Sequence, residues 1–324
     1  MATLTAAPAT DAELIPAIQE LKRELNAVIL AHYYQADEIQ AQADFIGDSL
    51  QLARQAATTK AEVIVFCGVH FMAETAKILN PGKLVLLPDL EAGCSLSDNC
   101  PAGPFKAFID AHPGHVVVTY VNSSAAVKAL SDYCVTSSNA IAVVKSIPRE
   151  TPIIFAPDQY LGDWVQRESG RPLVLWQGAC EVHENFSQNE ILRLQRENPG
   201  CVTLVHPECP LPIRALADVV GSTSQLLDAV KKGDPDGAYL VVTEPGIIYK
   251  MRQAAPRARF LMAPAEVGGS QLGSCTHCNT CPHMRRNTLR KLYWCMRNKA
   301  PRLELPQELL ERARLPIERM IAIG

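Results

Sequence analysis

The sequence lacks a surplus of charge, a long hydrophobic run and a secretion leader. Its 31 Lys and Arg residues against 34 Asp and Glu residues leave a net charge of −3, so no basic face favours nucleic acid as a partner. No apolar run approaches the roughly 18 residues that cross a membrane. The opening MATLTAAPATDAEL has neither the basic region nor the apolar core of a signal peptide. We therefore expect a cytoplasmic protein that binds neither nucleic acid nor membrane.

Cysteine, by contrast, is abundant, with 11 residues in a chain of 324. Without a secretion signal, this number favours metal binding or redox chemistry over a disulfide scaffold. Cys275, Cys278 and Cys281 form a C-x₂-C-x₂-C run followed by Pro282, which is similar to the cysteine run of iron–sulfur ferredoxins without its fourth member. A run of three cannot complete a site, so further ligands must come from elsewhere.

The chain also repeats three times with a period near 87 residues. His32 and Tyr120 are 88 positions apart, Tyr120 and His206 are 86 apart, and Cys94 and Cys180 are again 86 apart. Each copy alternates helical segments with short apolar runs such as VIVF, VVVTY and VTLV, which are typical of strands covered on both faces in a parallel sheet. The pattern predicts an α/β protein of three homologous βαβαβ units, each a three-layer αβα domain.

The repeat boundaries predict the domain organisation. We expect a first domain at residues 11–90 plus 284–324, a second at 91–178 and a third at 179–283. The last segment reads as two or three amphipathic helices closed by prolines, which we expect to pack back on the first domain.

Polar residues follow the first apolar run of each copy, where a parallel sheet binds its ligands. They are His32 and Tyr34 in the first copy, Tyr120 and Asn122 in the second, and His206 and Glu208 in the third. Each residue taken alone could be a half-buried aromatic or a solvated loop charge. Their equivalent positions indicate a shared site.

A hydroxyl cluster opens one helix in each copy, and the clusters contain Ser49, Ser137 and Thr223. Ser and Thr are favoured as helix N-caps for structural reasons alone. Three equivalent helix starts, however, would present free N–H groups to one small molecule that carries several anionic groups. Both interpretations remain open.

Cys94 and Cys180 occupy equivalent positions in the repeat, and we expect them to be the ligands that the cysteine run lacks. One thiolate from each copy would hold a [4Fe–4S] cluster with one open iron, and an open iron binds substrate oxygen as a Lewis acid. His183 could be a fourth ligand, but we expect it to line the pocket. Met284 would fill space near the cluster. We expect Cys67, Cys134, Cys201 and Cys295 to be buried apolar residues, and the sequence leaves the environment of Cys100 and Cys209 open.

Ordered motifs over nearly the whole length resemble the quinolinate synthase family. They include LAHYYQ, IGDSLQLA, FCGVHFMAETAKIL, AGCSLSD, TYVNSSAAVKALSDYCVTSSNA, FAPDQYLG, GACEVHE, VHPEC and GSTSQL. The resemblance implies three αβα domains around a pseudo-threefold axis, with the active site and a [4Fe–4S] cluster at their shared interface. It also implies condensation of iminoaspartate with dihydroxyacetone phosphate to quinolinate, with loss of phosphate and two waters, on the route to NAD. L-aspartate oxidase, which makes iminoaspartate, is a candidate partner.

Carried onto this sequence, the resemblance implies a set of site residues. The cluster ligands are Cys94, Cys180 and one member of the last run, for which we choose Cys281. The active-site residues are His32, Tyr34, Ser49, Tyr120, Asn122, Ser137, His206, Glu208 and Thr223.

The chemistry suggests a role for each of these residues. Glu208 and His206 would move protons to and from carbon, and the phenols of Tyr34 and Tyr120 would donate to a developing enolate oxygen. His32 and the residues with hydroxyl or amide groups would bind the substrate carboxylates or the phosphate.

Two other classes fit part of the pattern. An electron-transfer protein built on the C-x₂-C-x₂-C run would need a fourth cysteine ligand and leaves the hydroxyl clusters unexplained. A structural zinc module at the C-terminus would leave Cys94 and Cys180 as ordinary core thiols.

Overall fold

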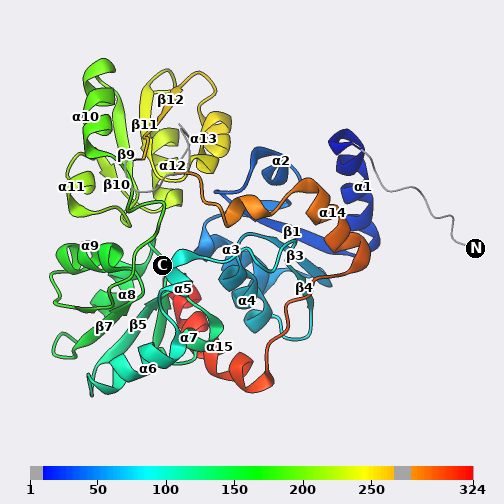
Figure 1. The fold of residues 1–324 in the computed structure, drawn as a ribbon, viewed down its shortest axis with the longest axis horizontal. Coiled ribbons are helices and arrows are strands. Elements are labelled where there is room, and N and C mark those ends of the chain that lie inside the picture. The colour runs from blue at the N-terminus through cyan, green and yellow to red at the C-terminus, as the bar shows by residue number, and fades with distance from the viewer. Residues whose placement is uncertain (1–9, 266–278, 324) are drawn as a thin grey trace, which may run out of the picture.

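The computed structural model describes residues 10–265 and 279–323. It contains three separate sheets of four parallel strands, and every sheet has the same order, with the second, first, third and fourth strands as neighbours. Helices flank each sheet, and the three lobes surround a common centre (Figure 1). The predicted fold class, three αβα domains, is confirmed.

The elements follow one another along the chain in the same manner in each domain. The first domain has β1 (Ala27–His32), β2 (Phe45–Gly47), β3 (Val63–Cys67) and β4 (Leu84–Leu86), with α1 (Asp11–Glu24), α2 (Asp37–Gln40), α3 (Ser49–Thr58) and α4 (His70–Leu79). The second has β5 (Val116–Tyr120), β6 (Tyr133–Val135), β7 (Ile153–Ala156) and β8 (Val174–Leu175), with α5 (Ser95–Asp98), α6 (Ala102–Asp110), α7 (Ala125–Lys128), α8 (Ala140–Ser146) and α9 (Gln159–Ser169). The third has β9 (Val202–Val205), β10 (Val219–Val220), β11 (Ala238–Val242) and β12 (Arg259–Met262), with α10 (Gln188–Glu197), α11 (Leu211–Arg214), α12 (Thr223–Lys232), the 3₁₀ turn η1 (Pro245–Ile247) and α13 (Ile248–Ala254). The chain closes with the 3₁₀ turn η2 (Met284–Arg286), α14 (Leu289–Asn298) and α15 (Gln307–Ala322).

Both faces of the first sheet are buried, which explains its unbroken apolar strands. Successive residues of a strand point to opposite faces. Ile29 of β1 packs with α1 and α14 on one face, whereas Leu30 packs with α3 and α4 on the other. A strand covered in this way has no polar alternation, so β1 and β3 are apolar almost throughout.

Each sheet has one strand more than the predicted βαβαβ unit. The additional strands are β2, β6 and β10, each at one edge of its sheet. They contain only two or three residues. The apolar stretches around them are too brief to show a hydrophobic period, so the sequence pattern did not reveal them. The equally short β4 and β8 lie within the longer apolar runs KLVLL and PLVLW, which made them recognisable.

The C-terminal helices differ in part from the prediction. Helix α14 packs against α1 on the first domain, as expected. Helix α15 lies between the first and second domains, where it contacts β6 and α7 as well as α3 and α4 (Figure 1). Its last turn accepts hydrogen bonds from Arg54 of α3 and from Asn139 at the start of α8. The helix therefore joins two domains instead of extending one. Among the described helices, none has the length and apolar character needed to cross a membrane.

Candidate active site

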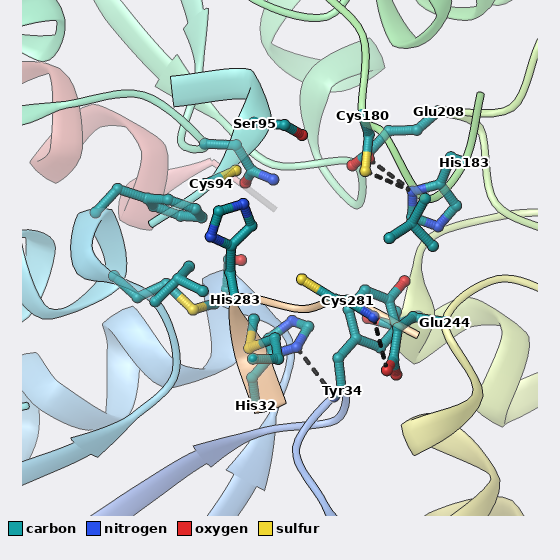
Figure 2. Close-up of a pocket in the computed structure, with 18 of the residues that line it drawn as sticks. His32, Tyr34, Cys94, Ser95, Cys180, His183, Glu208, Glu244, Cys281 and His283 are labelled. Carbon is teal, nitrogen blue, oxygen red and sulfur yellow. Dashed lines mark hydrogen bonds and ion pairs between the residues drawn. The ribbon is translucent and has the colours of Figure 1, made fainter. Parts of the chain in front are cut away.

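All twelve residues predicted from the sequence line one cavity where the three domains meet. The first strands of the three sheets end at this cavity, with His32 and Tyr120 as the last residues of β1 and β5 and His206 directly after β9. The rest of the set around the cavity comprises Tyr34, Ser49, Cys94, Asn122, Ser137, Cys180, Glu208, Thr223 and Cys281. Figure 2 shows side chains from separate domains facing this space.

The three cysteines reach the cavity from equivalent loops. Cys94, Cys180 and Cys281 each lie in the segment after the fourth strand of their sheet, and their sulfur atoms point into the same space (Figure 2). Burial raises the pKa of the Cys94 and Cys281 thiols to about 12 and that of Cys180 well above its ordinary value. These groups therefore keep their protons until a cation binds and displaces them. Cys275 and Cys278 lie outside the described residues.

A set of hydrogen bonds converges on the Glu208 carboxylate. Tyr120 donates its phenol proton to Oε1 at 2.5 Å, and His183 Nδ1 lies 2.9 Å from Oε2. Burial alone would raise the pKa of Glu208, but the His183 and His206 imidazoles and these hydrogen bonds outweigh it and lower the pKa to about 2. Glu208 is thus an ionised carboxylate with an ordered set of proton donors.

The two tyrosines remain protonated in this setting. Burial and the charge of Glu208 raise the pKa of both Tyr34 and Tyr120 well above the ordinary value. Each phenol can therefore donate a hydrogen bond at neutral pH, as the predicted role requires.

His32 and His206 are neutral and share one geometry. Burial lowers the pKa of each to about 3, although the charge of Glu208 opposes the shift. In each ring Nδ1 accepts a hydrogen bond from the backbone N–H two residues later, that of Tyr34 in one case and Glu208 in the other. The proton of each neutral ring is therefore on Nε2. Both histidines act as hydrogen-bond donors from Nε2.

The predicted helix starts are present, and capping is performed by neighbouring residues. Asp48 caps α3 and Ser222 caps α12, each within a capping box. Ser49 and Thr223 are the first residues inside these helices and line the cavity. In the second domain Ser137 lies in the turn before α8, which begins after Asn139. The hydroxyls that face the cavity are thus not needed as caps.

Cys180, His183 and Glu208 form a group that could hold a metal ion. Their possible ligand atoms all lie within 4.8 Å of one another, and His183 Nδ1 is 3.3 Å from Cys180 Sγ. His183 lines the cavity, as expected. Because its Nδ1 is closer to Glu208 Oε2 than to Cys180 Sγ, we assign its proton to the carboxylate contact.

Thr243 and Glu244 are among the residues at the site that the sequence analysis missed. They follow β11, the third strand of the third sheet. Glu244 lines the cavity and binds the backbone N–H of Cys281 and the Arg285 guanidinium, while Thr243 contacts Tyr34 and His183. Third strands end at the same edge of a parallel sheet as first strands, so the polar pair after AYLVV was a usable signal.

Most of the remaining cysteines lie within the core. Cys67, Cys134 and Cys295 are buried, as expected, whereas Cys201 is partly exposed. Cys100 and Cys209, which the sequence left open, are also buried. None of these six lines the cavity.

Comparison with known proteins gives a consistent result. Residues 16–322 match the family model described as quinolinate synthetase A protein. The quinolinate synthase of Prochlorococcus marinus (strain MIT 9303) is 54% identical over 319 residues, which is 98% of this chain and 93% of that protein. The quinolinate synthase of Synechococcus sp. (strain ATCC 27144 / PCC 6301 / SAUG 1402/1) is 55% identical over 319 residues, 98% of each chain. The match spans all three domains and the shared cavity, and the chain belongs to the quinolinate synthase family.

Proposed function

We propose that this protein condenses iminoaspartate with dihydroxyacetone phosphate to form quinolinate, phosphate and two waters, in the biosynthesis of NAD. One observation carries the proposal: in a chain of this family, one cysteine from each domain faces the same cavity as the Tyr120–Glu208 pair. Three converging thiols and an ordered carboxylate suit a reaction that needs repeated proton transfer beside a metal centre.

Cys94, Cys180 and Cys281 would hold a [4Fe–4S] cluster with one open iron. The donor set fits, because all three are free thiols that line one cavity from three directions. Thiolate is the usual protein ligand of such clusters. When bound, the cluster supplies a Lewis acid toward substrate oxygen.

Glu208 is the group that takes and returns a proton at carbon. It is ionised and held at both oxygens by Tyr120 and His183, so its position is fixed before substrate arrives. Tyr120 and Tyr34 hold protons that they can donate to an oxygen on which negative charge develops. His206 is neutral, and its Nε2–H is suited to orienting a substrate oxygen.

The remaining predicted residues bind the substrates. His32 donates from Nε2, and Ser49 and Thr223 lie at helix starts that favour anionic groups. Ser137 faces the cavity from the turn before α8. Asn122 Oδ1 is buried and has no hydrogen-bond partner in the described part of the chain. An acceptor left unpaired in this way suits the N–H of an imine.

The proposal also includes the domain boundaries, the cellular location and the partner enzyme. The division into domains at residues 11–90 plus 284–324, 91–178 and 179–283 is part of the same proposal, and each of the three cluster ligands follows the fourth strand of one of the three sheets. The cytoplasmic location and delivery of iminoaspartate by L-aspartate oxidase complete the proposal.

Anaerobic purification followed by an assay for quinolinate tests the function. The protein should be brown, absorb near about 400 nm, contain about four irons per chain and form quinolinate from the two substrates. Cys94→Ser, Cys180→Ser and Cys281→Ser should each lose the cluster, whereas Cys201→Ser, in a loop away from the cavity, should retain it. A colourless protein that contains zinc would support the structural zinc module instead, and a full active cluster in Cys180→Ser would refute one ligand per domain.

A further inference from the structure

Glu244 holds both ends of the turn that carries Cys281. Its side chain is buried at the second position after β11. The carboxylate atom Oε1 accepts the backbone N–H of Cys281 at 3.4 Å, which Figure 2 marks with a dashed line, and the Nη2 donor of Arg285 at 2.8 Å. The backbone N–H of Arg285 donates in turn to the carbonyl oxygen of Cys281 at 3.2 Å. One carboxylate oxygen therefore binds the first and the last residue of the turn 281–285.

The second oxygen of this carboxylate attaches it to the third domain. Oε2 accepts the backbone N–H of Gly246 at 2.6 Å and so caps the 3₁₀ turn η1. A Cβ atom at position 246 would lie 2.8 Å from the same oxygen, so this close approach depends on glycine. The carboxylate is thus fixed to the end of β11, and the turn that carries Cys281 is fixed to the carboxylate.

Cys281 depends on such an anchor more than the other two cysteines do. The cysteine lies 8 residues after the fourth strand in the first sheet, 5 residues after it in the second and 19 residues after it in the third. The entropic cost of fixing the end of a segment grows with the length of the segment. In the described part of the chain, the Glu244 carboxylate is the acceptor of the Cys281 amide. Hydrogen bonds to Glu244, and not a short connection to the sheet, therefore place the third thiol.

We propose that Glu244 is a positioning residue that holds Cys281 in place for binding of the cluster. The proposal rests on the proposed function for the role of Cys281 as a ligand. Its local content, the attachment of the turn 281–285 to Glu244, rests on the hydrogen bonds alone. A hydrogen-bond partner of this kind strengthens a metal site because it orients the ligand before the metal binds.

Glu244→Met removes the acceptor oxygens with little change in the length of the side chain. The amide of Cys281, the amide of Gly246 and the guanidinium of Arg285 would each lose an acceptor. Arg285 is partly exposed and can turn to solvent. The turn 281–285 would lose the link that joins it to the end of β11.

Glu74→Met is the matched control. Glu74 is also a buried glutamate, and its carboxylate also accepts a backbone N–H, that of Ala125 at 2.8 Å. It does not line the cavity. The two variants therefore lose comparable groups, but only Glu244→Met affects a segment that carries a cluster ligand.

Transfer of iron to a chelator measures how firmly the cluster is held. Anaerobically prepared holoprotein is mixed with an excess of a chelator for ferrous iron, and the coloured complex is followed with time. We expect Glu244→Met to release its iron about 10- to 100-fold faster than the wild-type protein, and Glu74→Met to release it at nearly the wild-type rate. A folded Glu244→Met protein that takes up no cluster would also support the proposal. Equal release rates in the wild-type protein and Glu244→Met would overturn it.

Amide hydrogen exchange in the full-length chain without iron separates this inference from the proposed function. We expect the Cys281 amide to be protected in the wild-type protein and in Glu74→Met, and the segment 281–285 to exchange about tenfold faster in Glu244→Met. A merely structural role for Glu244 would instead raise exchange throughout the third domain, and that result would overturn the proposal. An unprotected Cys281 amide in the wild-type protein would overturn it even if Glu244→Met does not fold. A wild-type protein that binds no cluster and makes no quinolinate but shows the expected exchange would overturn the proposed function and leave the attachment of Cys281 to Glu244 in place.

Discussion

The ends of β1 and β9 are alike in backbone and different in chemistry. Each places a neutral histidine whose Nδ1 accepts the backbone N–H two residues later, at 3.1 Å for His32 and 3.4 Å for His206. The residue that supplies this N–H is Tyr34 in the first domain and Glu208 in the third. The same turn therefore presents a proton donor at one place and a carboxylate at the other. The repeat conserves how a histidine is held and changes which reactive group stands beside it.

The second domain completes the comparison. Tyr120 occupies the strand end that a histidine occupies in the other two, and its phenol binds the carboxylate of the third domain at 2.5 Å. Three similar domains thus supply unlike groups that act on each other. A single domain could not assemble this site.

Substitution of Glu208 or Tyr34, the reactive residues beside the two histidines, should have the largest effect on kcat. Glu208→Gln should lower kcat by about 100-fold or more, since a carboxamide cannot take up a proton and cannot accept from both Tyr120 and His183. Tyr34→Phe should cost about tenfold, because it removes one donor and leaves the carboxylate in place. Quinolinate formation by each variant, normalised to its cluster content, measures both effects.

Either of two results would contradict this ranking. Normal turnover in Glu208→Gln would remove that carboxylate from the mechanism. A larger loss in Tyr34→Phe than in Glu208→Gln would mean that the first domain supplies the principal reactive group.

The buried, neutral histidine at each of the two strand ends predicts that the stability of the fold depends on pH. The folded-state pKa of His32 and of His206 is about 3, against an ordinary value of 6.5, so the unfolded chain binds more protons between these values. The stability contributed by each neutral ring is complete above pH 6.5 and is lost as the pH falls through this window. Between pH 6.5 and pH 5, each histidine should lower the free energy of unfolding by up to about 2 kcal/mol.

Urea unfolding of the iron-free full-length chain at pH 7 and pH 5 measures this loss. His32→Gln and His206→Gln should each lose about 2 kcal/mol less than the wild-type protein between these pH values. Equal losses in all three proteins would show that the rings are already charged or exposed.

The periodicity of the sequence was sufficient to predict the site residues that occupy equivalent positions in the three repeats. His32 and His206 could be paired by position because both follow a strand covered on both faces, and the edge where parallel strands end is fixed by topology. The contact between Thr243 and Tyr34 could not be found in this way, because the two residues are 209 positions apart in the sequence. The position of α15 between two domains likewise depends on tertiary packing. Patterns within one repeat carry no information about such contacts between repeats.

The smallest predicted effect is a difference in unfolding free energy between variants of the N-caps of α3 and α12, the helices that begin with Ser49 and Thr223. Asp48 accepts from the backbone N–H of Gln51 and also from Ser224 Oγ across the domain boundary, at 2.9 and 2.6 Å. Ser222→Ala should cost about 1 kcal/mol of unfolding free energy, the usual value for a lost N-cap. Asp48→Ala should cost about 1 kcal/mol more, because a charged hydrogen bond between domains is lost as well. Urea unfolding of both variants and of Ser224→Ala, combined with Asp48→Ala in a double-mutant cycle, isolates that bond. A coupling energy of zero would show that the first and third domains meet at this helix start without stabilising one another.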